Sequence, residues 1–126
     1  MQKGKVLIVD DEIHVVQILD YKLKKAGYQV LGASSGPQAL EMCKQEPPDI
    51  ILLDIMMPEM DGWEVLAKLK ADDATKNIPV FMLTAKAQRA DLMKGLSRGV
   101  DHYIIKPFVP QRVLELIDQR LGLAPA

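Results

Sequence analysis

Three aspartates end two apolar segments of this chain, and together they have the chemistry to hold a divalent cation. Asp10 and Asp11 directly follow the apolar run Lys5 to Val9. Asp54 directly follows a second run, Ile50 to Leu53. Three carboxylates at adjacent strand ends repel one another and raise the pKa of at least one of them. A bound cation removes this conflict, and oxygen ligands without a nearby histidine or thiolate favour magnesium over zinc.

Two further polar residues follow apolar runs and have the chemistry to contact a phosphoryl group. Thr84 ends the run that begins at Val80, and Lys106 ends the run that begins at Tyr103. A carboxylate can attack phosphorus to give an aspartyl phosphate, so Asp54 is the predicted nucleophile. The Lys106 ammonium can pair with one phosphoryl oxygen, and the Thr84 hydroxyl can donate a hydrogen bond to another.

The apolar runs that carry these residues are short and apolar at successive positions, which is typical of strands buried on both faces of a parallel sheet. Segments with helical periodicity separate the runs. Strands that alternate with helices run parallel, so their carboxyl ends gather along one edge of the sheet. Ligands of open α/β sheets bind at that edge. The sequence therefore predicts that all of these polar residues meet at one site.

The turn residues predict five strands in alternation with five helices. The predicted helices begin near Asp11 or Glu12 and stop at Gly27, run from Gly36 to about Gln45, from Gly62 to Lys70, from about Ala87 to Arg98, and onward from about Pro110. The last of these carries Val109, Val113, Ile117 and Leu121 on one face. The remaining strand is predicted at Tyr28 to Ala33, and Asp61 is predicted to cap the third helix.

Length and composition narrow the class of protein. The 126 residues suit one domain, with 26% charged residues and a formal net charge of -1. This balance argues against direct binding of nucleic acid. The single cysteine, Cys43, cannot form an internal disulfide, and no apolar run approaches the ~20 residues of a membrane-spanning helix. We therefore expect a cytoplasmic protein without membrane insertion.

The motifs together resemble the receiver domains of two-component response regulators, of the chemotaxis-regulator type. The chain carries "VDDE", "DIMMPEMDG", "LTA" and "KPF" in the order and separation of that family. The resemblance implies a flavodoxin-like α/β fold, with a doubly wound five-stranded parallel sheet in the order 2-1-3-4-5 and five helices. Residues 1–122 would form the receiver domain. Residues 123–126 would be a frayed end or the start of a linker.

The resemblance also implies a role for each residue of the site. A histidine kinase or a phosphotransfer protein would donate a phosphoryl group to Asp54, and the downstream effector is not specified. The implied magnesium ligands are Asp10, Asp11, Asp54 and the backbone carbonyl of Met56. Lys106 would contact the phosphoryl group, Thr84 and Tyr103 would form the switch pair, and the Lys106-Pro107 peptide bond would be cis.

The predicted function is a phosphorylation-dependent signalling switch that assists its own phosphotransfer and dephosphorylation, and not an enzyme. The alternative is a phosphatase that also forms an aspartyl phosphate. Such a phosphatase places a second aspartate two positions after the nucleophile, where this chain has Met56. A third class, the flavin-binding electron carriers, needs a hydroxyl-rich phosphate loop after the first strand, and the acids here would repel that phosphate.

Three other residues near these motifs have simpler interpretations. His14 and His102 are expected to be surface histidines, not ligands or phosphate carriers. Glu12 is expected to be only a favourable charge at the start of a helix.

Overall fold

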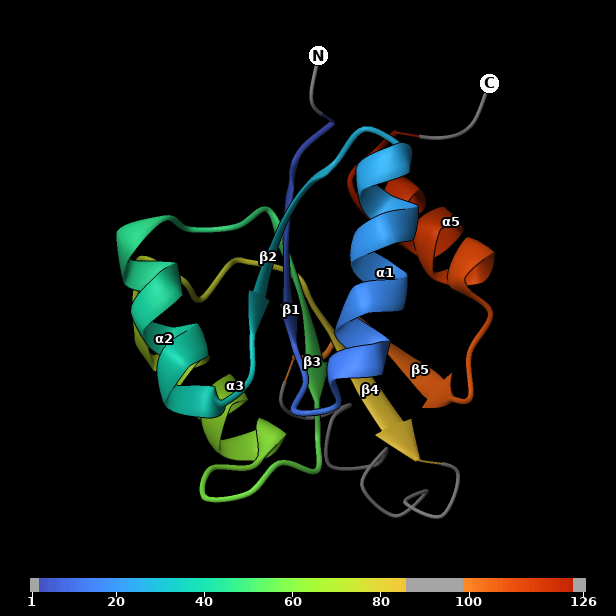
Figure 1. Cartoon of the computed structure of the whole chain (residues 1–126). Helices are drawn as coiled ribbons and strands as arrows, with labels where there is room; N and C mark the ends of the chain where they lie inside the picture. Colours follow the sequence, from blue (N-terminus) through green and yellow to red (C-terminus); the bar gives the residue numbers. More distant parts are fainter. Residues whose placement is uncertain (1–2, 86–98, 124–126) are drawn as a thin grey trace.

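The structure is a computed structural model that describes residues 3–85 and 99–123, and its centre is one parallel sheet (Figure 1). The strands are β1 (Lys5–Val9), β2 (Gln29–Ala33), β3 (Ile50–Asp54), β4 (Val80–Ala85) and β5 (His102–Lys106). The helices are α1 (Ile13–Lys25), α2 (Gly36–Gln45), α3 (Gly62–Ala71) and α5 (Pro110–Arg120). The helix expected at about 87–98 lies outside the described residues. None of the helices in the described ranges is long and apolar enough to cross a membrane.

The five strands are arranged in the order β2-β1-β3-β4-β5, which confirms the predicted topology. All neighbouring strands pair in parallel, so their carboxyl ends lie at one edge. Figure 1 shows α1 and α5 against one face of the sheet and α2 and α3 against the other. Each face carries its own buried apolar cluster, and the two clusters share the sheet as their common wall.

The apolar runs of the central strands are buried as the sequence predicted, whereas β5 is not. Every residue of β3 is buried, and Val6 to Val9 of β1 have no exposed surface. β5 lies at the edge of the sheet, with Ile104 buried and Ile105 45% exposed. An edge strand has a neighbouring strand on one side only, so it is less enclosed than a central strand. An apolar run in such a strand therefore does not show that both of its faces are buried.

Two of the helices begin at side-chain caps. The Ser35 hydroxyl accepts a hydrogen bond from the backbone N–H of Gln38 at 3.3 Å, at the start of α2. Asp61 caps α3 as predicted, because its carboxylate accepts from the N–H of Glu64 at 2.9 Å. Glu12 occupies the cap position of α1 but makes no side-chain cap bond. Its carboxylate is therefore available for another contact.

The last helix starts at Pro110 as predicted, but one residue of its expected apolar face lies outside it. Val109 is the extended residue before α5 and is 65% exposed, so it does not belong to the buried face. Val113 and Ile117 do lie on that face and are buried. Pro110 is the first helical residue, where its missing N–H costs no helical hydrogen bond.

Gly62 fixes the loop that follows β3. A Cβ atom at this position would lie 2.5 Å from the backbone carbonyl oxygen of Asp54, which is too close for any other residue. The Gly62 N–H also donates to the carbonyl of Ile55 at 2.8 Å. The loop is thus folded tightly back on the end of β3, where it helps to hold Asp54 in place.

Candidate functional site

Three of the predicted carboxylates meet at the carboxyl edge of the sheet. Oxygen atoms of Asp10, Asp11 and Asp54 all lie within 4.8 Å of one another. Asp10 and Asp54 are 1% and 4% exposed, whereas Asp11 is exposed. The sheet topology explains this grouping, because β1 and β3 are adjacent and end at the same height. The arrangement could hold a metal ion.

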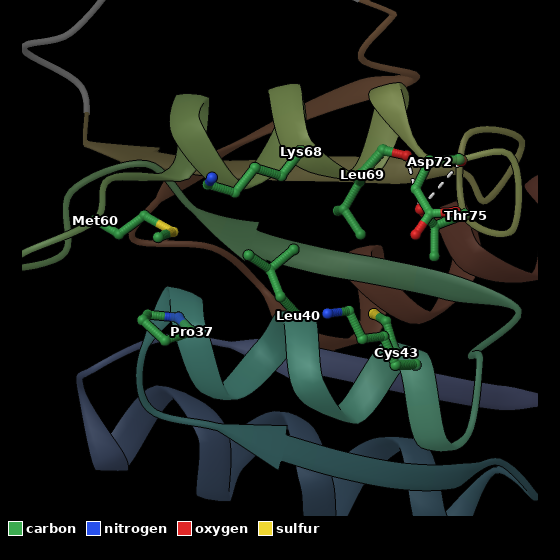
Figure 2. Close-up of a pocket in the computed structure, with 9 residues that line it drawn as sticks. Pro37, Leu40, Cys43, Met60, Lys68, Leu69, Asp72 and Thr75 are labelled. Atoms are coloured by element: carbon green, nitrogen blue, oxygen red, sulfur yellow. Dashed lines mark hydrogen bonds between the residues drawn. The ribbon is translucent and has the colours of Figure 1, made fainter.

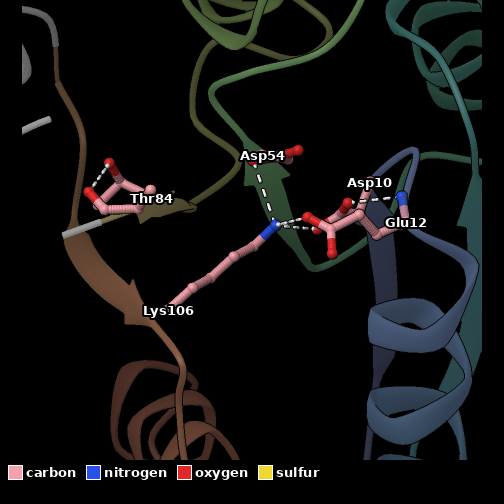
Figure 3. Close-up of polar contacts among 6 residues, drawn as sticks. Asp10, Glu12, Asp54, Thr84 and Lys106 are labelled. Atoms are coloured by element: carbon pink, nitrogen blue, oxygen red, sulfur yellow. Dashed lines mark hydrogen bonds and ion pairs between the residues drawn. The ribbon is translucent and has the colours of Figure 1, made fainter. Parts of the chain in front are cut away.

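Lys106 extends into this cluster from the end of β5, as Figure 3 shows. Its Nζ lies 2.9 Å from Asp10 Oδ2, 3.2 Å from Glu12 Oε1 and 3.5 Å from Asp54 Oδ1. One ammonium therefore faces three carboxylates. The Lys106-Pro107 peptide bond is cis, as the resemblance implied.

The two oxygens of the Asp10 carboxylate have different partners. Its Oδ1 accepts a hydrogen bond from the backbone N–H of Glu12 at 2.9 Å. Its Oδ2 is buried and faces the Lys106 ammonium at 2.9 Å, with no other donor among the described residues. A carboxylate oxygen with a single donor keeps a spare lone pair. Hard oxygen donors with spare lone pairs are what magnesium prefers, so the residues present fit this ion.

The electrostatics of the site destabilise the charged form of Asp54 in the absence of metal. Burial raises the pKa of Asp54 to about 7, and the charge of Asp10 adds to the rise. Lys106 and a backbone hydrogen bond from Met56 oppose the shift without cancelling it. For Lys106, burial works to lower the pKa, but hydrogen bonding to Asp10 and the charge of Asp54 leave it raised. The ammonium therefore stays charged.

The predicted switch residues lie on the two strands beyond β3. Thr84 is buried in β4, and its hydroxyl donates to the backbone carbonyl of Ala85 at 3.2 Å. Tyr103, on β5, is half-buried and packs against the apolar cluster on the α2 and α3 face. Met56 follows β3 with its side chain 61% exposed.

Glu12 was underestimated by the interpretation of the sequence. Its carboxylate contacts Lys106, so it is more than a charge at a helix start. The two residues are 94 positions apart, and only its place beside the acid pair gave a signal. His14 and His102 are exposed, in agreement with the prediction that they are surface residues.

A second hollow, of about 300 Å³, lies between α2 and α3 (Figure 2). Its lining is formed by Pro37, Leu40, Cys43, Lys44, Met60, Lys68, Leu69, Asp72 and Thr75. The Thr75 hydroxyl donates to the carbonyl of Leu69, and the Asp72 carboxylate accepts from the N–H of Ala74. Burial raises the pKa of the Cys43 thiol to about 11, which disfavours the thiolate. This hollow has one carboxylate and no ligand set for a cation.

Comparison with known proteins identifies a family. The model of the response regulator receiver domain matches residues 6–118. A probable transcriptional regulator, ycf27 of Guillardia theta, is 45% identical over 111 residues, which are 88% of this chain and 42% of that protein. The alkaline phosphatase synthesis transcriptional regulatory protein PhoP of Bacillus subtilis is 44% identical over 109 residues, 86% of this chain and 45% of that protein. The chain thus spans less than half the length of these curated relatives.

Solved structures agree with the family match. The chemotaxis protein CheY4 of Vibrio cholerae superposes with a TM-score of 0.87 at 33% identity, covering 94% of this chain and 98% of that one. A CheY-like receiver domain from Methanospirillum hungatei gives a TM-score of 0.85 at 37% identity, covering 96% of each chain.

Proposed function

The chain belongs to the response regulator receiver domain family, a family of phosphorylation-dependent signalling switches, and we propose that Asp54 is its phosphoacceptor. The observation that carries this proposal is the place of Asp54. Asp54 ends β3, and the ammonium of Lys106 contacts both its carboxylate and that of Asp10. Within the described residues, the one group of carboxylates that could hold a metal is formed by Asp10, Asp11 and Asp54.

Phosphotransfer at this site follows from the roles of the side chains. An oxygen of the deprotonated Asp54 carboxylate attacks phosphorus, the new P–O bond forms as the bond to the donor breaks, and the donor group leaves with the electron pair. Magnesium, which we assign to Asp10, Asp11, Asp54 and the Met56 carbonyl, supplies positive charge that lowers the repulsion between the carboxylates and the phosphoryl oxygens. Lys106 supplies a second positive charge and Thr84 a hydrogen bond.

The output of the switch uses Thr84 and Tyr103 in our proposal. The Thr84 hydroxyl turns from the Ala85 carbonyl toward the phosphoryl oxygens. Tyr103 then moves inward into the space that Thr84 has left. One hydrogen bond to a charged group contributes about 1.5–3 kcal/mol, whereas a shift from 1:99 to 99:1 needs about 5.5 kcal/mol. Lys106 and the metal must add differential contacts, or the active state is already populated before phosphorylation.

The partners follow from the family. Response regulators interact with histidine kinases and with effector domains, and we propose a histidine kinase or a phosphotransfer protein as the donor. Residues 1–122 form the receiver domain in this proposal, and residues 123–126 connect it or fray. Two relatives are named as transcriptional regulators, and the chain spans less than half of each, so we assign no DNA contact to the receiver itself.

A small phosphodonor tests the proposal. Incubation with acetyl phosphate and magnesium should add one phosphoryl group to the protein, seen by intact mass, and peptide mapping should place it on Asp54. A phosphatase would instead turn over the donor without a lasting mass gain. Absence of any phosphorylated species in the presence of magnesium would refute the assignment of Asp54.

The switch is tested separately with Thr84→Ala. This variant should accept the phosphoryl group, but the phosphorylation-dependent change in the NMR signals of Tyr103 should be lost. The parent protein, recorded in parallel, is the control. A tyrosine shift of the same size in both proteins would show that Thr84 does not transmit the change.

A further inference from the structure

Lys106 lies closer to Asp10 and Glu12 than to Asp54. Its ammonium is 2.9 Å from Asp10 Oδ2 and 3.2 Å from Glu12 Oε1, but 3.5 Å from Asp54 Oδ1 (Figure 3). A phosphoryl group on Asp54 brings further negatively charged oxygens toward this ammonium, so the two shorter contacts and the phosphoryl group draw on the same cation. Whatever strengthens these contacts therefore competes with the phosphoryl group for Lys106.

Glu12 is placed to act as such a competitor. Its backbone N–H is fixed by the carboxylate of Asp10 at 2.9 Å, so its side chain starts beside the cluster. At the cap position of α1 this side chain makes no hydrogen bond to the helix. Its carboxylate is 62% exposed, whereas the side chain of Lys106 is only 16% exposed. Glu12 thus contacts the ammonium from the open side of the site, where an incoming phosphodonor also has to approach.

We propose that Glu12 is a positioning residue that holds Lys106 on the Asp10 side until a phosphoryl group displaces it. This inference rests on the proposed function, because it assumes phosphorylation of Asp54. Glu12 adds one negative charge that a dianionic donor meets at the entrance, and it stabilises the unphosphorylated arrangement of the lysine. Both effects slow the transfer of the phosphoryl group. Because the ion pair is exposed on one side, its expected effect is a factor of about two to five.

Glu12→Gln tests the proposal, because it keeps the shape of the side chain and removes its charge. The rate of phosphorylation by acetyl phosphate, measured at fixed magnesium concentration, should rise about two- to fivefold. In this reaction an oxygen of Asp54 bonds to phosphorus as the bond to the acetate oxygen breaks, and acetate leaves. A rate equal to the parent rate, or below it, would overturn the proposal.

Two controls separate positioning from a general effect of charge. Glu64 is an exposed acid in the first turn of α3, so Glu64→Gln removes the same charge from the start of another helix without touching Lys106. Its rate should equal the parent rate. In a Lys106→Met background, Glu12→Gln should accelerate the reaction less than it does in the parent, because only the repulsion between Glu12 and the donor is then removed. An acceleration of the same size in either control would show that Glu12 does not act through Lys106.

The outcomes also separate this inference from the proposed function. If the parent protein takes up no phosphoryl group, the assignment of Asp54 fails and the inference falls with it. If the parent is phosphorylated and Glu12→Gln is no faster, only the role of Glu12 is refuted.

Discussion

A buried aspartate lies near a lysine at each end of the sheet, but the two aspartates differ in how well they are satisfied. At the amino end, Asp118 of α5 accepts a hydrogen bond from the Tyr28 hydroxyl and lies 3.5 Å from the ammonium of Lys3. One carboxylate there has two partners. At the carboxyl end, Lys106 is shared by three carboxylates. The first arrangement is complete as it stands, whereas the second has an excess of negative charge that a cation can relieve.

The difference teaches how to tell a structural ion pair from a functional one. Burial and the neighbouring Asp118 raise the pKa of Tyr28, so the phenol stays protonated and keeps its hydrogen bond. Burial and the neighbouring Asp10 raise the pKa of Asp54 to about 7, so its charged form is destabilised. Perturbed pKa values occur at both ends. Of these two ends, only the carboxyl end has a surplus of like charges, which fits the metal and phosphoryl site that we propose there.

The largest expected effect is on phosphorylation, which a substitution at the carboxyl end should abolish and a substitution at the amino end should not. Asp54→Asn should take up no phosphoryl group from acetyl phosphate and magnesium, because the amide is not a nucleophile for phosphorus. Asp118→Asn is the matched control and should be phosphorylated like the parent protein. Intact mass measures both. Equal phosphorylation of the two variants would erase the distinction drawn between the two ends.

The second largest effect should be on magnesium affinity, which should depend on the aspartates at the carboxyl end and not on Asp118. Asp10→Asn removes one negative charge and one predicted ligand, so the affinity should fall roughly 10- to 100-fold, as measured by isothermal titration calorimetry. Asp118→Asn should leave the affinity unchanged. If both variants bind magnesium like the parent, the cluster at the carboxyl end is not the metal site.

A substitution at the amino end should lower the free energy of unfolding without changing phosphorylation. Tyr28→Phe leaves Asp118 buried without its hydroxyl donor, which should lower the free energy of unfolding by about 1.5–3 kcal/mol. Urea denaturation measures this loss, and the rate of phosphorylation should stay at the parent value. A stability equal to that of the parent would mean that Lys3 alone satisfies Asp118.

The smallest expected effect is a change in how stability depends on pH. In the metal-free protein, the pKa of Asp54 is about 7, well above its ordinary value of 3.8. Between pH 3.8 and pH 7, Asp54 keeps its proton in the folded protein but loses it in the unfolded chain. The free energy of unfolding therefore falls as the pH rises from 3.8 toward 7. Asp54→Asn removes this loss, so the variant should be more stable than the parent at pH 8.

Urea denaturation of both proteins at pH 5 and pH 8, in the presence of a chelator, checks this expectation. Addition of magnesium should narrow the difference at pH 8, because the ion favours the charged form of Asp54. A parent protein that loses no more stability than Asp54→Asn between the two pH values would contradict a raised pKa.

Much of the fold and the set of site residues could be predicted from the sequence. Apolar runs and helical periodicity are local patterns, and the alternation of strands with helices implies parallel strands. The carboxyl ends of such strands share one edge, so Asp10, Asp54 and Lys106 could be placed together before any coordinates. The caps at Ser35 and Asp61 are also local, because each contact joins residues three positions apart.

Only the tertiary structure decided the contacts that give these residues their properties. Tyr28 and Asp118 are 90 positions apart, and Lys106 and Glu12 are 94 positions apart. No periodicity relates residues at such separations, because their distance depends on how α1 and α5 pack beside the sheet. The raised pKa of Asp54 likewise needs its burial and the position of Asp10, which belong to the folded state. The chain thus determines which groups arrive at the edge, and packing determines which charges are left unbalanced there.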